Sequence, residues 1–277
     1  MKIRFWGARG SFATPGHQYL KYGGHTTSIE FVSSSGQQLL VDLGTGATEF
    51  AKELMKGGFA KGEGKLDILL THTHLDHIQG LPFFTPFFIK GNKISIHGPE
   101  VDGKSLADIL QNQLNGYYSP LYGLENLAAG VEVKSMAANA NLKLDDFEIT
   151  SIHLPHGEAS VLGFRVTCDG KSAIVMTDVE HGKAGPSKDI LRFAHQCDVL
   201  IHDAMFSDDE YPGRVGWGHS SVSSAVDVGE LTEAKLVVLT HHSPDSSDQK
   251  IDTMVAIAAT RAKIAVMAAR EGLVVDL

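Results

Sequence analysis

Three histidines and an aspartate fall within six residues in the segment THTHLDH, residues 71–77. The apolar run Leu66–Leu70 directly precedes this segment and predicts a buried strand. On a strand, His72 and His74 point to the same face, because side chains alternate with a period of two. The aspartate and the third histidine can turn toward the same point where the chain leaves the strand. Imidazole nitrogens and carboxylate oxygens suit Zn²⁺, Mn²⁺ and Fe²⁺, so the segment predicts a metal site.

Three further residues of ligand type stand just beyond apolar runs in the second half of the chain: His156, Asp178 and His241. The runs before the last two are Ser172–Met176 and Lys235–Leu239. A charge or an imidazole at the mouth of a buried strand is costly unless it is paired or bound to a metal. Taken singly, each of these residues reads as an ordinary strand cap or loop residue. Together with the segment 71–77, they predict ligands contributed by several strand ends.

The order His-x-His-x-Asp-His, then a later His, a later Asp and a final His resembles that of the metallo-β-lactamase-fold hydrolases. In this chain the pattern is represented by His72, His74, Asp76, His77, His156, Asp178 and His241. Asp42, in Val41-Asp42-Leu43-Gly44, matches the family's first motif, a structural aspartate behind the metal site. The resemblance spans almost the whole chain. It implies an α/β fold, a four-layer αβ/βα sandwich of two mixed sheets flanked by helices, with a dinuclear site at one edge.

Within that superfamily the chain looks more like the phosphodiesterase branch that includes ribonuclease Z. Asp178 belongs to the metal-binding set, in place of the cysteine typical of true β-lactamases. The segments His202-Asp203-Ala204-Met205-Phe206 and Gly218-His219-Ser220-Ser221 are similar to the His-Glu-Ala-Thr and His-Ser-Thr elements of ribonuclease Z. Asp203 replaces the glutamate of the first element.

The resemblance implies two divalent metal ions, with Zn²⁺ preferred and Mn²⁺ or Fe²⁺ as alternatives. One ion would be bound by the histidine set His72, His74 and His156. The other would be bound by the mixed set Asp76, His77 and His241. Asp178 would bridge the two ions, which could then share a hydroxide that acts as the nucleophile.

The resemblance also implies catalytic roles for Asp76, His219 and Asp203. His219 would assist the phosphate or the leaving group, and Asp203 would orient His219 or a metal ligand. The alternative for His219 is a residue at a helix start, because two serines that are good N-caps follow it. Two neighbouring histidines compete with proposed ligands, His153 with His156 and His242 with His241. Arg9 is expected to be either a substrate contact or a solvated charge, and the role of His25 is open. Four further histidines are expected to have no functional role: His17, His97, His181 and His195.

The elements that must position these residues alternate between strands and helices. We expect strands at Lys2–Phe5, Thr27–Val32, Gln38–Leu43, Leu66–Leu70, Lys93–Ile96, Phe147–Ile152, Leu162–Thr167, Ser172–Met176, Asp198–His202, Lys235–Leu239 and Leu273–Val275. We expect helices at Ala47–Lys56, Ser105–Leu114, Pro186–Ala194, Ser221–Leu231 and Asp248–Ala269. Residues 116–146 give no clear pattern. No linker-like stretch interrupts the chain, which predicts a single domain over residues 1–277.

Charge and composition narrow the partners. The 24 Lys and Arg residues against 33 Asp and Glu residues give a net charge of −9, which disfavours non-specific binding to nucleic acid. The chain has two cysteines, no run of 18 apolar residues and no signal-peptide pattern at its start. We therefore expect a cytoplasmic protein without a membrane span. A homodimer is an option that the sequence leaves open.

These observations favour a di-metal phosphodiesterase that hydrolyses a small phosphodiester, such as a cyclic nucleotide or a cyclic phosphate, through a metal-bound hydroxide. The alternatives are an RNA-processing nuclease like ribonuclease Z, a lactonase or β-lactamase, and a metal-binding protein without activity. Ribonuclease Z has a protruding arm between its third and fourth motifs. Here that interval runs from His156 to Asp178, and a predicted hairpin around Asp169-Gly170 fills most of it. The aromatic stretch Leu81–Phe88 either lines a pocket beside the site or packs in the core.

Overall fold

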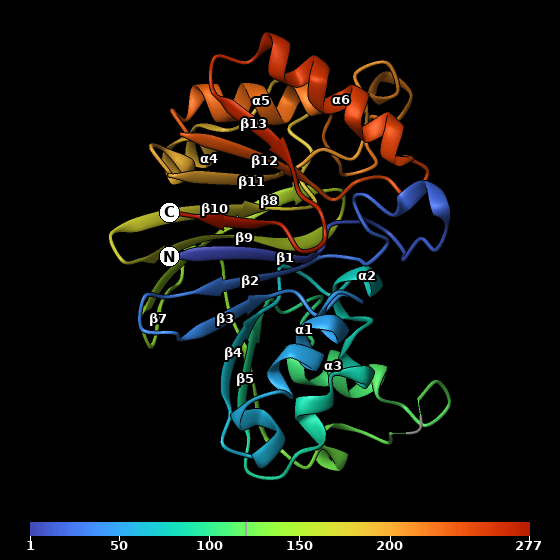
Figure 1. Cartoon of the computed structure of the whole chain (residues 1–277), viewed down its shortest axis with the longest axis vertical. Coiled ribbons are helices and arrows are strands. Elements are labelled where there is room, and N and C mark those ends of the chain that lie inside the picture. Colours follow the sequence, from blue (N-terminus) through green and yellow to red (C-terminus); the bar gives the residue numbers. More distant parts are fainter. Residues whose placement is uncertain (120) are drawn as a thin grey trace.

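Two mixed β-sheets form the centre of the structure (Figure 1), a computed structural model that describes residues 1–119 and 121–277. The described strands of the first sheet are, in spatial order, β14 (Val274–Asp276), β1 (Lys2–Gly7), β2 (Ser28–Val32), β3 (Gln38–Val41), β4 (Lys65–Leu69), β5 (Lys93–Gly98) and β6 (Gly130–Ser135). Those of the second are β13 (Ala265–Ala268), β12 (Leu236–Thr240), β11 (Val199–Asp203), β10 (Lys171–Met176), β9 (Ala159–Cys168), β8 (Phe147–His156) and β7 (Asn141–Leu144).

Helices cover the outer faces of both sheets. They are α1 (Ala47–Leu54), α2 (Leu75–Ile78), α3 (Leu106–Gln113), α4 (Lys188–Ala194), α5 (Val222–Leu231) and α6 (Asp248–Arg261), with short 3-10 helices at His17–Tyr19, Gly58–Lys61, Leu81–Phe83, Thr85–Phe88, Leu124–Asn126 and Tyr211–Gly213. In Figure 1, α5 and α6 lie over the second sheet, while α1 and α3 lie beside the first. Four helices start with a serine whose hydroxyl accepts a backbone N–H three residues on: Ser105, Ser187, Ser221 and Ser247. None of the described helices is both long and apolar enough to cross a bilayer.

Strand alternation builds three apolar layers from this arrangement. In β3, Leu39 and Val41 enter the core between the two sheets, whereas Leu40 faces outward and packs with Phe50 of α1. A third apolar cluster lies between the second sheet and the helices that cover it. Burial on both faces of each sheet explains the apolar runs in the sequence. The predicted αβ/βα sandwich of two mixed sheets is confirmed.

The strands that precede the candidate site residues run parallel, so they end at the same edge. In the first sheet β3 pairs in parallel with β4, and in the second sheet β10, β11 and β12 pair in parallel. The chain returns from β9 to β10 through a tight turn at Asp169-Gly170, with Cys168 opposite Lys171, as the sequence predicted. The carboxyl ends of open α/β sheets are the usual location of a binding site.

The expected long helix Asp248–Ala269 is wrong in its second half. The helix α6 ends at Arg261, and β13 then pairs in parallel with β12. Ile264 and Val266 pack on the cluster under the helices, whereas Met267 packs on the core between the sheets. This period of two is typical of a strand, and the helix propensity of the surrounding alanines hides it. The strands β6 and β7 arise from residues 116–146, where no element was expected.

The core between the sheets should tolerate loss of volume poorly. Phe31 is fully buried there, so Phe31→Ala should lower the free energy of unfolding by about 3–5 kcal/mol. The matched control is Phe83→Ala, because Phe83 is 63% exposed and its loss should change stability by less than about 0.5 kcal/mol. Denaturant titration of the metal-loaded variants measures both values. Equal effects of the two substitutions would contradict the assignment of Phe31 to the core.

Candidate metal centre

The segment that follows β4 presents its side chains through a sharp change of backbone. His74 has an extended backbone and is the N-cap of α2, a single helical turn that contains Asp76 and His77. His72 precedes this turn, directly after the buried Thr71. Because β4 ends at Leu69, neither His72 nor His74 lies on a strand, and the expectation that strand alternation aligns them is wrong. The irregular segment and the helical turn bring the ligand-type side chains to the site instead.

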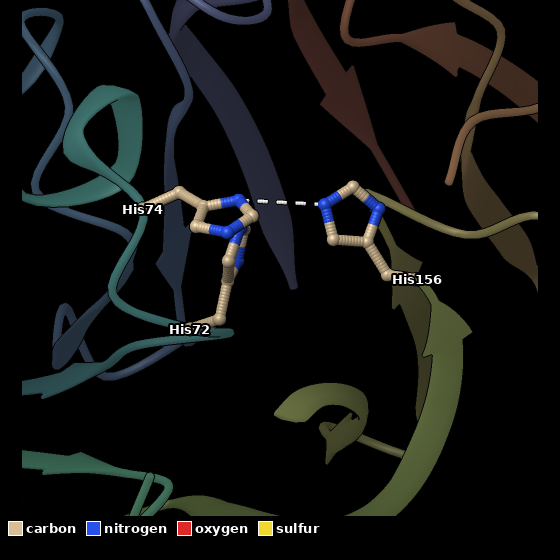
Figure 2. A group of neighbouring side chains, drawn as sticks. All are labelled: His72, His74 and His156. Atoms are coloured by element: carbon tan, nitrogen blue, oxygen red, sulfur yellow. Dashed lines mark hydrogen bonds between the residues drawn. The ribbon is translucent and has the colours of Figure 1, made fainter. Parts of the chain in front are cut away.

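Three histidines from two sheets form the first group of candidate ligands. His156 is the last residue of β8 in the second sheet, and it meets His72 and His74 from the first (Figure 2). Nε2 of His156 lies 3.4 Å from Nδ1 of His74. One nitrogen from each of the three residues falls within 4.8 Å of the others. The sequence expectation that placed His156 in a loop beyond its strand is wrong, because β8 extends to this residue.

A second group adjoins the first. Asp76, His77, Asp178 and His241 also offer one ligand atom each within 4.8 Å of one another. Nε2 of His241 lies 3.2 Å from Oδ2 of Asp76, and Nε2 of His77 lies 3.3 Å from that same oxygen. His241 follows the end of β12, so this group also joins the two sheets.

Asp178 lies between the two groups and turns one oxygen toward each. Its Oδ1 is 3.9 Å from Nε2 of His72 and 3.8 Å from Nε2 of His156. Its Oδ2 is 3.1 Å from Nε2 of His77 and 3.3 Å from Nε2 of His241. This placement suits a carboxylate that touches two cations at once.

The charges of the site fit a bound cation. In the described part of the chain, Nε2 of His72 and Oδ2 of Asp178 are buried without a hydrogen-bond partner. Burial lowers the pKa of His72 well below its usual value, so its imidazole is neutral and can donate a lone pair. Burial disfavours the charged form of His77, but the carboxylates of Asp178, Asp76 and Asp42 outweigh that effect and raise its pKa well above its usual value. A divalent cation would supply the positive charge that these carboxylates otherwise draw from an imidazole.

Hydrogen bonds from behind fix the orientation of the candidate ligands. The carboxylate of Asp42 accepts from Nδ1 of His77 at 2.8 Å and from the backbone N–H of Thr71 at 2.8 Å. Nδ1 of His156 donates to the carbonyl oxygen of Gly218 at 2.6 Å. Each of these bonds leaves Nε2 as the nitrogen directed at the site, which is the usual support of a metal-binding histidine.

The backbone at the site adopts conformations that most residues avoid. Asp42, Asp178 and His241 have φ values of 66°, 54° and 58°, in the left-handed region. Asp and His are among the residues that tolerate this region best, and such residues gather at functional sites. These residues lie where the chain leaves β3, β10 and β12, at the edge that contains the site.

Sequence reasoning missed the contribution of the loop after β1. The backbone N–H of Ser11 donates to Oδ2 of Asp76 at 2.8 Å. Gly10 lies so close to the ring of His241 that an added Cβ would come within 2.4 Å of it. A backbone donor leaves no trace in side-chain type, and only the glycine before it hints at the close approach.

His219 and Asp203 form a buried pair beside Asp178. Nδ1 of His219 donates to Oδ2 of Asp203 at 2.7 Å and lies 3.9 Å from Oδ1 of Asp178. Burial disfavours the charged imidazole, but Asp203 outweighs this effect and raises the pKa of His219 to about 9. Asp203 also accepts from the backbone N–H groups of Ser220 and Met205. The structure therefore brings together both residues with the candidate ligands.

The residue that starts the helix α5 is a serine, and not His219. Ser221 is the N-cap of α5, and the hydroxyl of Ser220 donates to the carbonyl oxygen of Val179 at 2.6 Å. His219 makes no cap to α5 among the described hydrogen bonds, so the side chain is available for another role.

Both expectations for Arg9, a substrate contact or a solvated charge, are wrong. Its side chain is fully buried and donates to the carbonyl oxygens of Gly23, Ser243 and Ser246. A guanidinium with five fixed donors can hold several carbonyls at once. Arg9 thus ties the loop after β1 to the segment after His241.

The competing histidines differ in exposure and contacts. His153 is exposed, while His242 is buried and donates from Nε2 to the carbonyl oxygen of Ala269 at 3.0 Å. Neither faces the two groups of candidate ligands. His181, expected to be incidental, is instead buried with its Nε2 2.9 Å from Nε2 of His202. His25 contacts the hydroxyl of Thr45 through Nδ1 at 3.1 Å.

Comparison with known proteins agrees with this fold. Residues 38–242 match the family described as Beta-lactamase superfamily domain. Ribonuclease Z of Pyrobaculum arsenaticum is 28% identical over 236 residues, covering 77% of this chain and 79% of the relative. The metallo-beta-lactamase fold protein YhfI from Bacillus subtilis superimposes with a TM-score of 0.72 at 18% identity, covering 99% and 98% of the two chains. The short form of human tRNase Z gives 0.68 at 22% identity, covering 100% of this chain and 99% of that one.

The fold and the clustered histidines and aspartates define a metal-dependent hydrolase that binds divalent metal. The chain belongs to the beta-lactamase superfamily, and within it the sequence is similar to ribonuclease Z.

The histidines near the end of β8 allow a direct test of ligand choice. His156→Ala should lower the metal content by about one ion per chain or more, because it removes one of three imidazoles from the first group. His153→Ala is the matched control, since His153 is exposed on the same strand and should keep the wild-type content. Elemental analysis after reconstitution and desalting measures both. A loss of metal in His153→Ala with full content in His156→Ala would reverse the assignment.

Proposed function

We propose that the chain is a di-metal phosphodiesterase that hydrolyses small phosphodiesters, such as a cyclic nucleotide or a cyclic phosphate. The two ions, Zn²⁺ in the first instance, would be held by His72, His74 and His156 and by Asp76, His77 and His241. The observation that supports this best is the position of Asp178, with one carboxylate oxygen toward each set. When bound, a pair of divalent ions lowers the pKa of a water and withdraws charge from phosphoryl oxygens.

The protein's own contribution beyond the ligands comes from His219 and Asp203. Because Nδ1 of His219 is held by Asp203, Nε2 is the nitrogen left to meet a substrate. The neighbouring carboxylate of Asp203 raises the pKa of this imidazole to about 9. A protonated imidazole beside Asp178 can stabilise charge on a phosphoryl oxygen or give its proton to the leaving oxygen.

A ribonuclease Z-like nuclease is the second candidate, and the similarity to Ribonuclease Z from Pyrobaculum arsenaticum favours it. Two observations argue for a smaller substrate. The interval from His156 to Asp178 consists of the paired strands β9 and β10 and short connections, which leaves no room there for an arm. The net charge of −9 weakens the electrostatic attraction that dominates binding to nucleic acid.

The segment from the end of β5 to the start of β8 also offers a poor surface for RNA. Residues 98–146 contain three lysines, Lys104, Lys134 and Lys143, against seven acidic residues. Of these lysines, Lys134 pairs with Glu132 at 2.7 Å, which leaves less of its positive charge to attract a ligand.

A cytoplasmic location and a homodimer stay predictions from the sequence.

Substrate choice separates the candidate functions. The metal-loaded protein should hydrolyse bis-p-nitrophenyl phosphate and at least one of the 2′,3′- or 3′,5′-cyclic nucleotides, and a chelator should abolish this activity. The other substrates to be tested are a pre-tRNA transcript, a homoserine lactone and nitrocefin. Specific 3′-end cleavage of pre-tRNA at a rate equal to that of the best small diester would favour the nuclease. Activity confined to the lactone or nitrocefin would overturn the phosphodiesterase proposal.

The role of His219 predicts a loss of turnover without a loss of metal. His219→Ala should lower kcat on a phosphodiester by roughly 10²- to 10⁴-fold, the range for a positioned acid or hydrogen-bond donor. Metal content should stay at the wild-type level, because His219 is held by Asp203. His195→Ala, which removes an exposed imidazole, serves as the control. An unchanged kcat in His219→Ala would leave the residue with a structural role only.

A further inference from the structure

An exposed tryptophan lies in the loop just before the proposed catalytic residue His219. Trp217 is 62% exposed, although it precedes the buried Gly218 and lies two residues before His219. Its ring contacts Phe206 at a centroid distance of 6.4 Å, and Phe206 in turn contacts the ring of His219 at 6.0 Å. Trp217 is therefore two ring contacts away from the proposed proton donor.

The loop that presents this tryptophan is fixed on both sides by one carboxylate. Glu180 accepts the backbone N–H of Gly216 at 2.8 Å and that of Gly218 at 2.8 Å, and it accepts the hydroxyl of Tyr211 at 3.0 Å. Gly218 also provides the carbonyl oxygen that holds His156. A large apolar side chain on a rigid loop at the rim of a site binds a planar partner with little loss of entropy.

Arg214 adds a positive charge to the same surface. Its guanidinium carbon lies 5.2 Å from the ring centres of both Phe206 and Trp217. Among the described contacts, its side chain makes no hydrogen bond and no ion pair, so its N–H donors stay available to a ligand. In a chain with a net charge of −9, a cation held in this way at the rim attracts an anionic substrate.

We infer that Trp217, Phe206 and Arg214 form an aromatic platform that binds the base of a nucleotide substrate beside the metal centre. Trp217 stacks on the base with the ring face opposite Arg214, Phe206 holds Trp217 through an edge-to-face contact, and Arg214 supplies positive charge over the other face of Trp217. The inference rests on the proposed phosphodiesterase function and narrows it: the enzyme prefers a phosphodiester with a nucleobase over one without. Base–aromatic stacking is tolerant of base identity, so the platform selects for the presence of a base more than for its type.

The test compares two diesters with the same leaving group, thymidine 5′-p-nitrophenyl phosphate and methyl p-nitrophenyl phosphate. In the metal-loaded wild-type protein, kcat/KM should favour the nucleoside diester. Trp217→Ala should lower that preference by about tenfold or more, mainly through KM, as expected for the loss of one stacked base. Trp217→Phe should restore most of the preference, because it keeps a planar ring. Tyr117→Ala, which removes an aromatic side chain that is 90% exposed on the loop after α3, should keep it.

A preference that is unchanged in Trp217→Ala, or lost equally in Tyr117→Ala, would overturn the platform while leaving the phosphodiesterase intact. Hydrolysis of neither diester by the wild-type protein would count against the proposed function instead. Binding of the base can also be measured by tryptophan fluorescence, independently of activity. The chain has two tryptophans, so in Trp217→Phe only Trp6 contributes to the signal. Adenosine 2′,3′-cyclic phosphate should quench the tryptophan fluorescence of the wild-type protein and not that of Trp217→Phe, while ribose 5-phosphate should quench neither. Equal quenching of both proteins, or none in the wild type, would overturn the platform.

Discussion

A buried carboxylate that faces two groups of imidazoles at once constrains the rest of this structure. Asp178 is almost fully buried, and burial of an uncompensated charge is prohibitively costly. The imidazoles that face it come from both halves of the fold: His72 and His77 follow β4 of the first sheet, and His156 and His241 stand at strand ends of the second. The two sheets must therefore approach closely at this edge, and the apolar core between them must have the thickness that permits it. The packing of the core and the chemistry of the site share one geometric requirement.

Two other buried carboxylates make that edge rigid. Asp42 binds the ring of His77 together with the backbone of Thr71, and Asp203 binds the ring of His219 together with the backbone of Ser220. Each carboxylate thus joins a functional imidazole to the main chain of a strand end or helix start. Buried polar groups that are fully bonded specify one arrangement, because any other leaves a charge without partners. The left-handed backbone at Asp42 and Asp178 is kept by these contacts, since such strain persists only where the surroundings determine it.

The loop from Tyr211 to Gly218 connects the interior of the site with its rim. Its position depends on Glu180, which lies two residues after Asp178 and whose backbone N–H donates to the carbonyl oxygen of Pro155. These hydrogen bonds tie the loop to the segments that contain Asp178 and His156. A substrate group that rests on the rim is therefore held in a fixed relation to the candidate ligands.

The sequence by itself determined which residue types could bind metal and in what order they occur. The ligand types in residues 71–77 can be read directly from the sequence. The apolar runs that end just before Asp178 and His241 predict strands from local patterns and from the cost of burying charge. These features could therefore be predicted without the fold. The tertiary structure alone decided what local pattern leaves open. It extended β8 to His156, converted the alanine-rich end of a predicted helix into β13, and buried Arg9 against carbonyls from two distant segments. Each of these outcomes depends on a neighbouring strand or a backbone partner far away in sequence. Such pairings form hydrogen bonds that outweigh local propensity, and the residue types alone do not predict them.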